Sequence, residues 1–260
     1  MSTTTAGDIL ETLRGQRTNR PTTDLTLAGG LRSWLEDDLS PLTVDLSPSE
    51  PMFLSPRGIV APQLAAVPGL QALARSALVS ALLAQRVVLG EVAHPMDDAL
   101  AALESDPARA ELVETIHSLD ADGFAHLAAE VAAHHAVLAR QLGSIPPTWF
   151  PRVNSRLSTA LAGGRVVLGA VASLIVGPPA GAVASVCLLD VTTSTLESTT
   201  PTRLGVLALI ELLRSGAAPL RVGALSTATG EQLVLEVTDQ LLVDAVGDVV
   251  AAVRARRSAA

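Results

Sequence analysis

Between residues 61 and 142, apolar side chains recur every three or four positions, with polar or charged residues between them. The pattern is clear in LQALARSALVSALLAQRVV and again in FAHLAAEVAAHHAVLARQL. Apolar residues at this spacing form a stripe along one side of a helix, and that stripe packs against a neighbouring element. The segment therefore predicts three or four packed helices.

A joint rich in glycine and proline, from Gly143 to Pro151, ends this pattern, and the period then changes to two. RLSTAL, GRVVLGAVASLIVG and VASVCLLDVTT predict three strands of an antiparallel meander. TRLGVLALIELLRSG predicts a buried helix, PLRVGALSTATGEQLVLEVT two more strands, and residues 240–257 an amphipathic helix. The expected fold class is α/β, of mixed α+β type, with a mainly helical region over 1–147 and a β-β-β-α-β-β-α core over 148–260.

Two other segments have weaker patterns. Residues 1–60 mix short helices with loops; Asp8 is a candidate helix cap, and SPSEPMFLSP is punctuated by proline. The uncharged stretch from Val166 to Leu189 is long enough to cross a bilayer, but glycines and prolines interrupt its middle. Two buried strands joined by a turn explain it better, so no membrane association is expected.

The amino-acid composition limits the partners, cofactors and cellular location that can be expected. The 260 residues include 18 arginines and no lysine, and the usage is typical of a GC-rich genome, such as an actinobacterial one. The net charge of −8 disfavours a surface that is basic throughout. A single cysteine, Cys187, lies in an apolar strand and predicts core packing; it excludes an intramolecular disulfide and an iron–sulfur cluster built from this chain alone. The start, MSTTTAGDIL, does not resemble a secretory signal, so the cytoplasm is the expected location.

The meander, buried helix and returning hairpin over residues 148–257 resemble the RecB-like branch of the PD-(D/E)XK nucleases. Such nucleases place an aspartate on one strand, a (D/E)-x-K tripeptide on the next, and a Gln-x-x-x-Tyr segment at the start of the following helix. The resemblance implies carboxylates that hold Mg²⁺ and a lysine that orients the attacking water. Residues two apart on a strand share a face, which explains the spacing of the tripeptide.

Most of these family positions carry other residues in this chain. GRVVLGAVASLIVG resembles the first motif strand, and Ser173 stands where the aspartate is expected. CLLDVTT resembles the second, with Asp190 in the acidic position and Thr192 in place of the lysine. Arg203 and Leu207 stand at the spacing of the Gln-x-x-x-Tyr pair. By this placement only Asp190 keeps the family residue, and we expect all five positions to be vestigial.

A lone carboxylate is a poor Mg²⁺ site, and the neutral hydroxyl of Thr192 cannot replace a lysine cation. We therefore expect no functional catalytic residue, no cofactor and no metal site. Glu197, seven residues after Asp190, is the candidate that would rebuild a Mg²⁺ or Mn²⁺ site if a rearranged nuclease exists. Asp190 is also explained simply as a strand-end residue.

Two further clusters have structural as well as functional explanations. His126, Glu130 and His134, with His135 adjacent, are spaced along one helical face, but a polar, solvated face explains them better than a metal site. Another set, Arg152, Arg156 and Arg165, lies near the expected sheet and is a candidate for weak contact with nucleic acid; pairing with surface carboxylates is the favoured alternative.

The leading hypothesis is a catalytically inactive nuclease fold that serves as a structural or interaction subunit in a DNA-processing or defence assembly. A helicase or nuclease subunit is the expected protein partner, and direct DNA binding is a weaker expectation. An active Mg²⁺- or Mn²⁺-dependent nuclease with a rearranged site around Asp190 is one alternative. A protein-binding scaffold unrelated to DNA is another.

Overall fold

A mixed six-stranded sheet forms the centre of the molecule. The computed structural model describes residues 9–15, 25–60, 69–178 and 186–259. The strands of the sheet are β1 (Met52–Leu54), β2 (Arg152–Leu161), β3 (Val166–Val176), β4 (Cys187–Thr192), β5 (Arg221–Ser226) and β6 (Gln232–Glu236). Their order is β1-β3-β4-β5-β6, and β2 pairs along the other edge of β3.

The chain runs through this sheet largely as the period-two pattern predicts. β2, β3 and β4 form the expected antiparallel meander, and β5 and β6 form the expected hairpin. β4 and β5 are parallel, because α8 (Thr200–Ser215) connects them. The β-β-β-α-β-β-α order of elements is confirmed, and the fold is a mixed α/β one; the PD-(D/E)XK topology as such stays a prediction.

β1 was not predicted. It lies inside the proline-punctuated stretch SPSEPMFLSP, for which no strand was predicted, and it pairs in parallel with the first residues of β3, from Val166 to Leu168. Its middle residue, Phe53, covers Gly169, where a side-chain Cβ would lie 2.7 Å from the phenylalanine ring. The ring of Phe53 can therefore pack against the sheet at this point only because Gly169 has no side chain.

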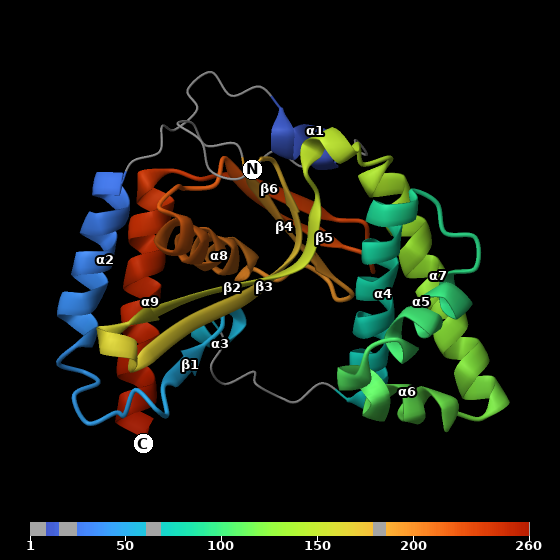
Figure 1. The fold of residues 1–260 in the computed structure, drawn as a ribbon, viewed down its shortest axis with the longest axis horizontal. Coiled ribbons are helices and arrows are strands. Elements are labelled where there is room, and N and C mark those ends of the chain that lie inside the picture. Colours follow the sequence, from blue (N-terminus) through green and yellow to red (C-terminus); the bar gives the residue numbers. More distant parts are fainter. Residues whose placement is uncertain (1–8, 16–24, 61–68, 179–185, 260) are drawn as a thin grey trace.

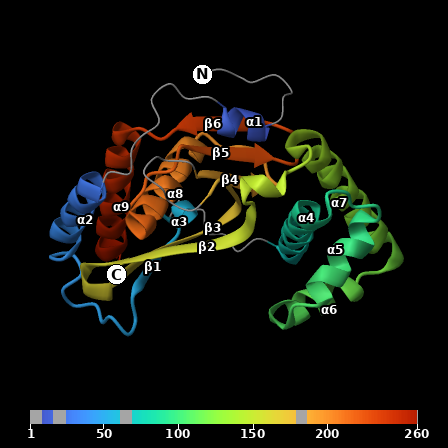
Figure 2. The same cartoon turned by 45° about the horizontal axis from the view of Figure 1, so that its top comes forward.

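The remaining helices are disposed in two groups. α2 (Leu25–Leu39), α3 (Pro56–Val60), α8 and α9 (Asp239–Ala259) lie on one side of the sheet (Figures 1 and 2). The other side holds α4 (Leu70–Leu89), α5 (Pro95–Glu104), α6 (Ala110–His117) and α7 (Ala121–Leu142), with the short α1 (Ile9–Arg14) near β5 and β6. Among the described residues from 69 to 142, four α-helices agree with the predicted three or four.

Local sequence explains several helix ends. Asp120 accepts a hydrogen bond from the N–H of Gly123 at 2.8 Å and so caps α7. Gly216 ends α8 in the left-handed conformation, with its N–H donated to the carbonyl of Leu212. Asp8, the predicted cap of the first helix, and most of the predicted Gly/Pro turn after β3 lie outside the described residues.

Each side of the sheet has its own core. One core joins α2, α8 and α9 to strand residues such as Leu168 and Val222. The other joins α1, α4, α5 and α7 to Leu174, Leu189 and Cys187. Cys187 is buried, as predicted, and its thiol donates a hydrogen bond to the carbonyl of Leu13. Both cores take side chains from before and after residue 147, and the division of the chain there stays a prediction.

One helix among the described residues, α4, has the length and apolar character that a membrane span needs. The same criterion is met by core helices of soluble proteins, so this observation is weak evidence. In the structure α4 packs against α5, α6 and α7.

Candidate functional site

The central strands of the sheet separate from one another beside α8. β3 pairs with β1 as far as Leu168 and with β4 only from Leu174 onward. A pocket of about 240 Å³ lies next to this separation. Its wall is formed by residues of β1–α3, α4, β3, β4 and α8: Ser55, Pro56, Arg57, Ser76, Ala170, Val171, Asp190, Val191, Thr192, Arg203, Leu204 and Leu207.

An ion pair between Asp190 and Arg203 lies in the wall of this pocket. Asp190 is the fourth residue of β4, and Arg203 lies in the first turn of α8. The Oδ2 atom of Asp190 is 3.1 Å from Nη2 of Arg203, and the two side chains are only 27% and 18% exposed. Burial raises the pKa of Asp190 above its ordinary value, while the positive charges of Arg203 and Arg57 oppose that rise.

Thr192 and Leu207 complete the part of the site that the resemblance identified. Thr192 lies two residues after Asp190, so regular strand alternation brings both to the pocket. The hydroxyl of Thr192 accepts a hydrogen bond from the N–H of Ser194 at 3.2 Å. Leu207, one turn after Arg203, adds an apolar side chain to the wall. The structure thus brings four of the five vestigial positions together.

Ser173, the fifth position, lies elsewhere. Its side chain lines a smaller cavity of about 140 Å³ together with residues of α4 and β2, and its hydroxyl accepts a hydrogen bond from the N–H of Val191 at 2.9 Å. The two cavities share Ser76, Val171 and Val191, so Ser173 is adjacent to the pocket but not part of its wall. The position aligned with the first family carboxylate therefore does not line the pocket that contains Asp190.

Glu197 does not join Asp190 either. It lines another cavity, of about 400 Å³, with Thr200 and residues of the β5–β6 turn. Its backbone N–H contacts the hydroxyl of Thr200 at 3.0 Å, and its carboxylate accepts a hydrogen bond from Thr199 at 3.2 Å. Through these hydrogen bonds to Thr199 and Thr200, Glu197 stabilises the start of α8. Among the described residues, no group of three or more His, Cys, Asp or Glu side chains has the arrangement of a metal site.

The candidate arginines of the nucleic-acid hypothesis are spread along the sheet. Arg152 opens β2, Arg156 pairs in register with Val171, and Arg165 follows β2 at its far end. Since β2 spans about 30 Å at the usual rise per strand residue, the three do not form one cluster. The arginine that does line the pocket with Arg203 is Arg57 of α3, which was not predicted because the sequence pattern marks neither β1 nor the short α3.

The polar residues of α7 differ in exposure: the side chain of His126 is 67% exposed, whereas Glu130 is partly buried and His134 is buried. Glu130 pairs with Arg75 of α4 at 2.9 Å, and His126 is 3.8 Å from the same carboxylate oxygen. The solvated-face interpretation is wrong for His134, which is only 7% exposed and forms a hydrogen bond with the backbone of Thr227. The helix turns this histidine toward the sheet, where it contacts the β5–β6 turn.

Comparison with known proteins does not assign the chain to a family. No protein-family model and no curated protein sequence matches the chain. The likeness to nucleases therefore depends on the motif residues and the order of elements described above.

Proposed function

We propose that this chain is a non-catalytic relative of the RecB-like nucleases that acts as an interaction subunit in a DNA-processing or defence assembly. The ion pair between Arg203 and Asp190, 3.1 Å long and mostly buried, is the observation that supports it. A guanidinium cation beside the one retained acidic residue occupies the electrostatic role that Mg²⁺ has in an active nuclease.

The chemistry of the pocket supports the loss of catalysis further. A Mg²⁺ ion bound at Asp190 would be repelled by Arg203 and Arg57 and would lack a second carboxylate in the wall. Displacing Arg203 from Asp190 would also leave a largely buried guanidinium without its ion-pair partner. The chain has no lysine that could orient a water molecule in the family manner.

The assembly belongs to the proposal through the resemblance alone, because a fold by itself does not determine a function. In this assembly the helicase or nuclease activity would come from the partner. The contribution of this chain would be a surface for that partner rather than a reaction.

A cleavage assay tests the catalytic part of the proposal. The purified protein and an Asp190→Ala variant are incubated with single- and double-stranded DNA in Mg²⁺ or Mn²⁺, and calorimetry measures metal binding to both. We expect no cleavage that depends on Asp190 and no difference in metal binding between the two proteins. Cleavage that is abolished by Asp190→Ala would overturn the proposal and indicate a rebuilt active site.

A further inference from the structure

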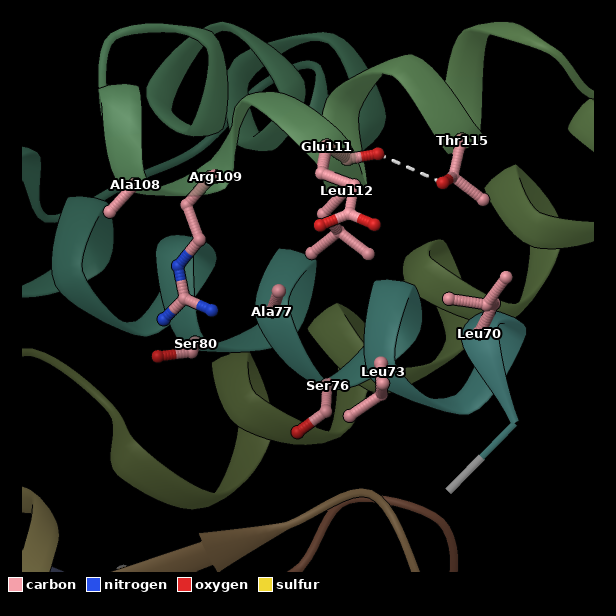
Figure 3. A pocket seen from close by; sticks show the side chains of 10 residues that line it. All are labelled: Leu70, Leu73, Ser76, Ala77, Ser80, Ala108, Arg109, Glu111, Leu112 and Thr115. Carbon is pink, nitrogen blue, oxygen red and sulfur yellow. Dashed lines mark hydrogen bonds between the residues drawn. The ribbon is translucent and has the colours of Figure 1, made fainter. Parts of the chain in front are cut away.

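A groove lies between α4 and α6, on the helical side of the molecule and apart from the Asp190 pocket. Its volume is about 400 Å³. Leu70, Leu73 and Ser80 line it from α4, Leu112 and Glu111 from α6, and Arg109 from the turn before α6 (Figure 3). Leu70 is 61% exposed and Leu73 39% exposed, although Leu78, Leu82 and Leu83 of the same helix fill a core. The groove therefore offers apolar surface that nothing within the described chain covers.

The length of the groove suits a helix. Leu70 and Ser80 are ten residues apart on α4, which corresponds to about 15 Å along its axis. Apolar residues at positions i, i+3 or i+4, and i+7 of a bound helix cover roughly 10 Å, so two or three such side chains fit along it. α4 and α6 form the two long walls that such a groove requires (Figure 3).

Charge determines what kind of helix fits. Residues 91–130, which comprise α5, α6 and the first part of α7, contain ten acidic residues and one arginine, a formal charge of −9. The rest of the chain contains 16 acidic residues and 17 arginines, a formal charge of +1. The net negative charge of the protein thus lies in the segment that contains α6, which forms one wall of the groove, whereas α4, which forms the other wall, carries two arginines and no acidic residue.

The one arginine in residues 91–130 does not make this surface positively charged. Arg109 lies 3.8 Å from Asp106, and both side chains are about half exposed. Glu111 and Glu114 remain exposed on α6, with Glu111 in the groove wall. A nucleic acid would be repelled by this surface, and so would a second copy of the chain that presented the same acidic helices. A basic partner would be attracted to it.

We propose that the groove between α4 and α6 binds an amphipathic helix of a partner protein, with apolar side chains against Leu70, Leu73 and Leu112 and with lysine or arginine residues beside α6. The inference rests on the proposed function only in treating the chain as an interaction subunit. It would stand even if the Asp190 pocket proved to be catalytic, because the two sites use different residues apart from Ser76, which borders both.

The test uses a displayed library of helical peptides, about four turns long, with varied apolar and charged positions, selected against the full chain. Enriched peptides are then synthesised with a fluorescent label, and their affinity is measured by anisotropy. We expect a consensus with apolar residues at i, i+3 or i+4, and i+7 and with flanking lysine or arginine. Its affinity should fall steeply as the salt concentration rises.

Variants locate the binding surface. Leu73→Asp removes an apolar contact from the groove, and Glu111→Arg reverses a charge in its wall; each should weaken binding at least about tenfold. Leu89→Asp is the matched control, because Leu89 is 69% exposed at the opposite end of the same helix and does not line the groove. Circular dichroism checks that the variants remain folded, and the exposed Glu111 keeps the test valid if Leu73→Asp does not fold.

Three results would overturn the inference: no enriched peptide, a consensus that is acidic or neutral, or binding that Leu73→Asp and Glu111→Arg leave unchanged. Self-association of the chain that Leu73→Asp abolishes would also overturn it, since the occupant would then be a second copy. The DNA-cleavage assay has an independent readout, so a failure here and a failure of the proposed function can be told apart.

Discussion

Replacing Arg203 by glutamine should expose how strongly the protein depends on the ion pair with Asp190. The change keeps a polar side chain of moderate length but removes the positive charge that lies 3.1 Å from the carboxylate. With an effective dielectric constant of about 20, charges at 3.1 Å attract each other by about 5 kcal/mol. In the variant, water that enters the pocket can solvate the carboxylate of Asp190, which is 27% exposed, and this solvation offsets part of the lost attraction. We expect the free energy of unfolding to fall by about 2–4 kcal/mol at neutral pH.

The size of this loss should depend on pH. Because folding raises the pKa of Asp190 above its ordinary value of 3.8, the folded state binds more protons than the unfolded state between 3.8 and the raised value. Stability therefore falls as the pH rises through that window. Loss of Arg203 raises the pKa of Asp190 further and deepens the fall. The deficit of Arg203→Gln should consequently be smaller near pH 4 than near pH 8.

Urea denaturation of four proteins measures this prediction: the natural chain, Arg203→Gln, Asp190→Asn and the double variant. The double variant should lose less stability than the sum of the two single losses, because neither charge is then left alone. Arg109→Gln is a matched control with an expected cost below about 0.5 kcal/mol, since its pair with Asp106 is longer and half exposed. A cost of Arg203→Gln below about 1 kcal/mol, or a cost that is equal at both pH values, would refute the reasoning.

Three further predictions follow from buried positions. Burial lowers the pKa of His134 below 6.5, so its stabilising effect is present above that pH and is lost as the pH falls; His134→Gln should flatten the decline of the urea midpoint below about pH 6.5. Gly223→Ala should cost about 1–3 kcal/mol in thermal unfolding, because the new Cβ would lie 3.1 Å from the carbonyl oxygen of Leu233. The thiol of Cys187 should not react with a disulfide reagent until the protein is denatured; rapid labelling of the native chain would contradict its burial.

Much of the fold could be predicted from the sequence because its elements are long and regular. The helices α4 and α7 repeat their apolar residues over five or six turns, and α8 has Pro201 in its first turn and Gly216 as its C-cap. β1 could not be predicted in this way. It has three residues between prolines, and its position depends on pairing with β3 and on the space above Gly169. Such contacts between distant segments leave no local periodicity.

Four of the residues that line the pocket could be predicted from the sequence, and Arg57 could not. Asp190 and Thr192 were assigned to one face by strand alternation, and both line the pocket because β4 is regular there. Arg203 and Leu207 were assigned by helical spacing and also line it. Arg57 could not be assigned, because it follows β1 and reaches the pocket only through the pairing of β1 with β3. The electrostatics of the pocket therefore depend on a residue that the motif does not include.

Ser173 was aligned with a family carboxylate, but the alternation of β3 is interrupted at this residue. Ala172 and Leu174, two positions apart, belong to cores on opposite sides of the sheet, and Asn154 of the paired strand has a φ of +49°. Because such an interruption changes which residues face the pocket, the β3 residues that line it with Asp190 are Ala170 and Val171, and Ser173 is not among them.

This reading of β3 can be tested by building a metal site. With Arg203→Gln in both proteins, Ala170→Asp should bind Mn²⁺ at least about tenfold more tightly than Ser173→Asp, because only the former adds a second carboxylate to the pocket wall. Calorimetry measures the two affinities, and Arg203→Gln alone is the control. Equal affinities would mean that Ser173 reaches Asp190 after all. The alignment of Ser173 with the first family carboxylate would then be correct, and the interruption of β3 at Ser173 would have no consequence for the site.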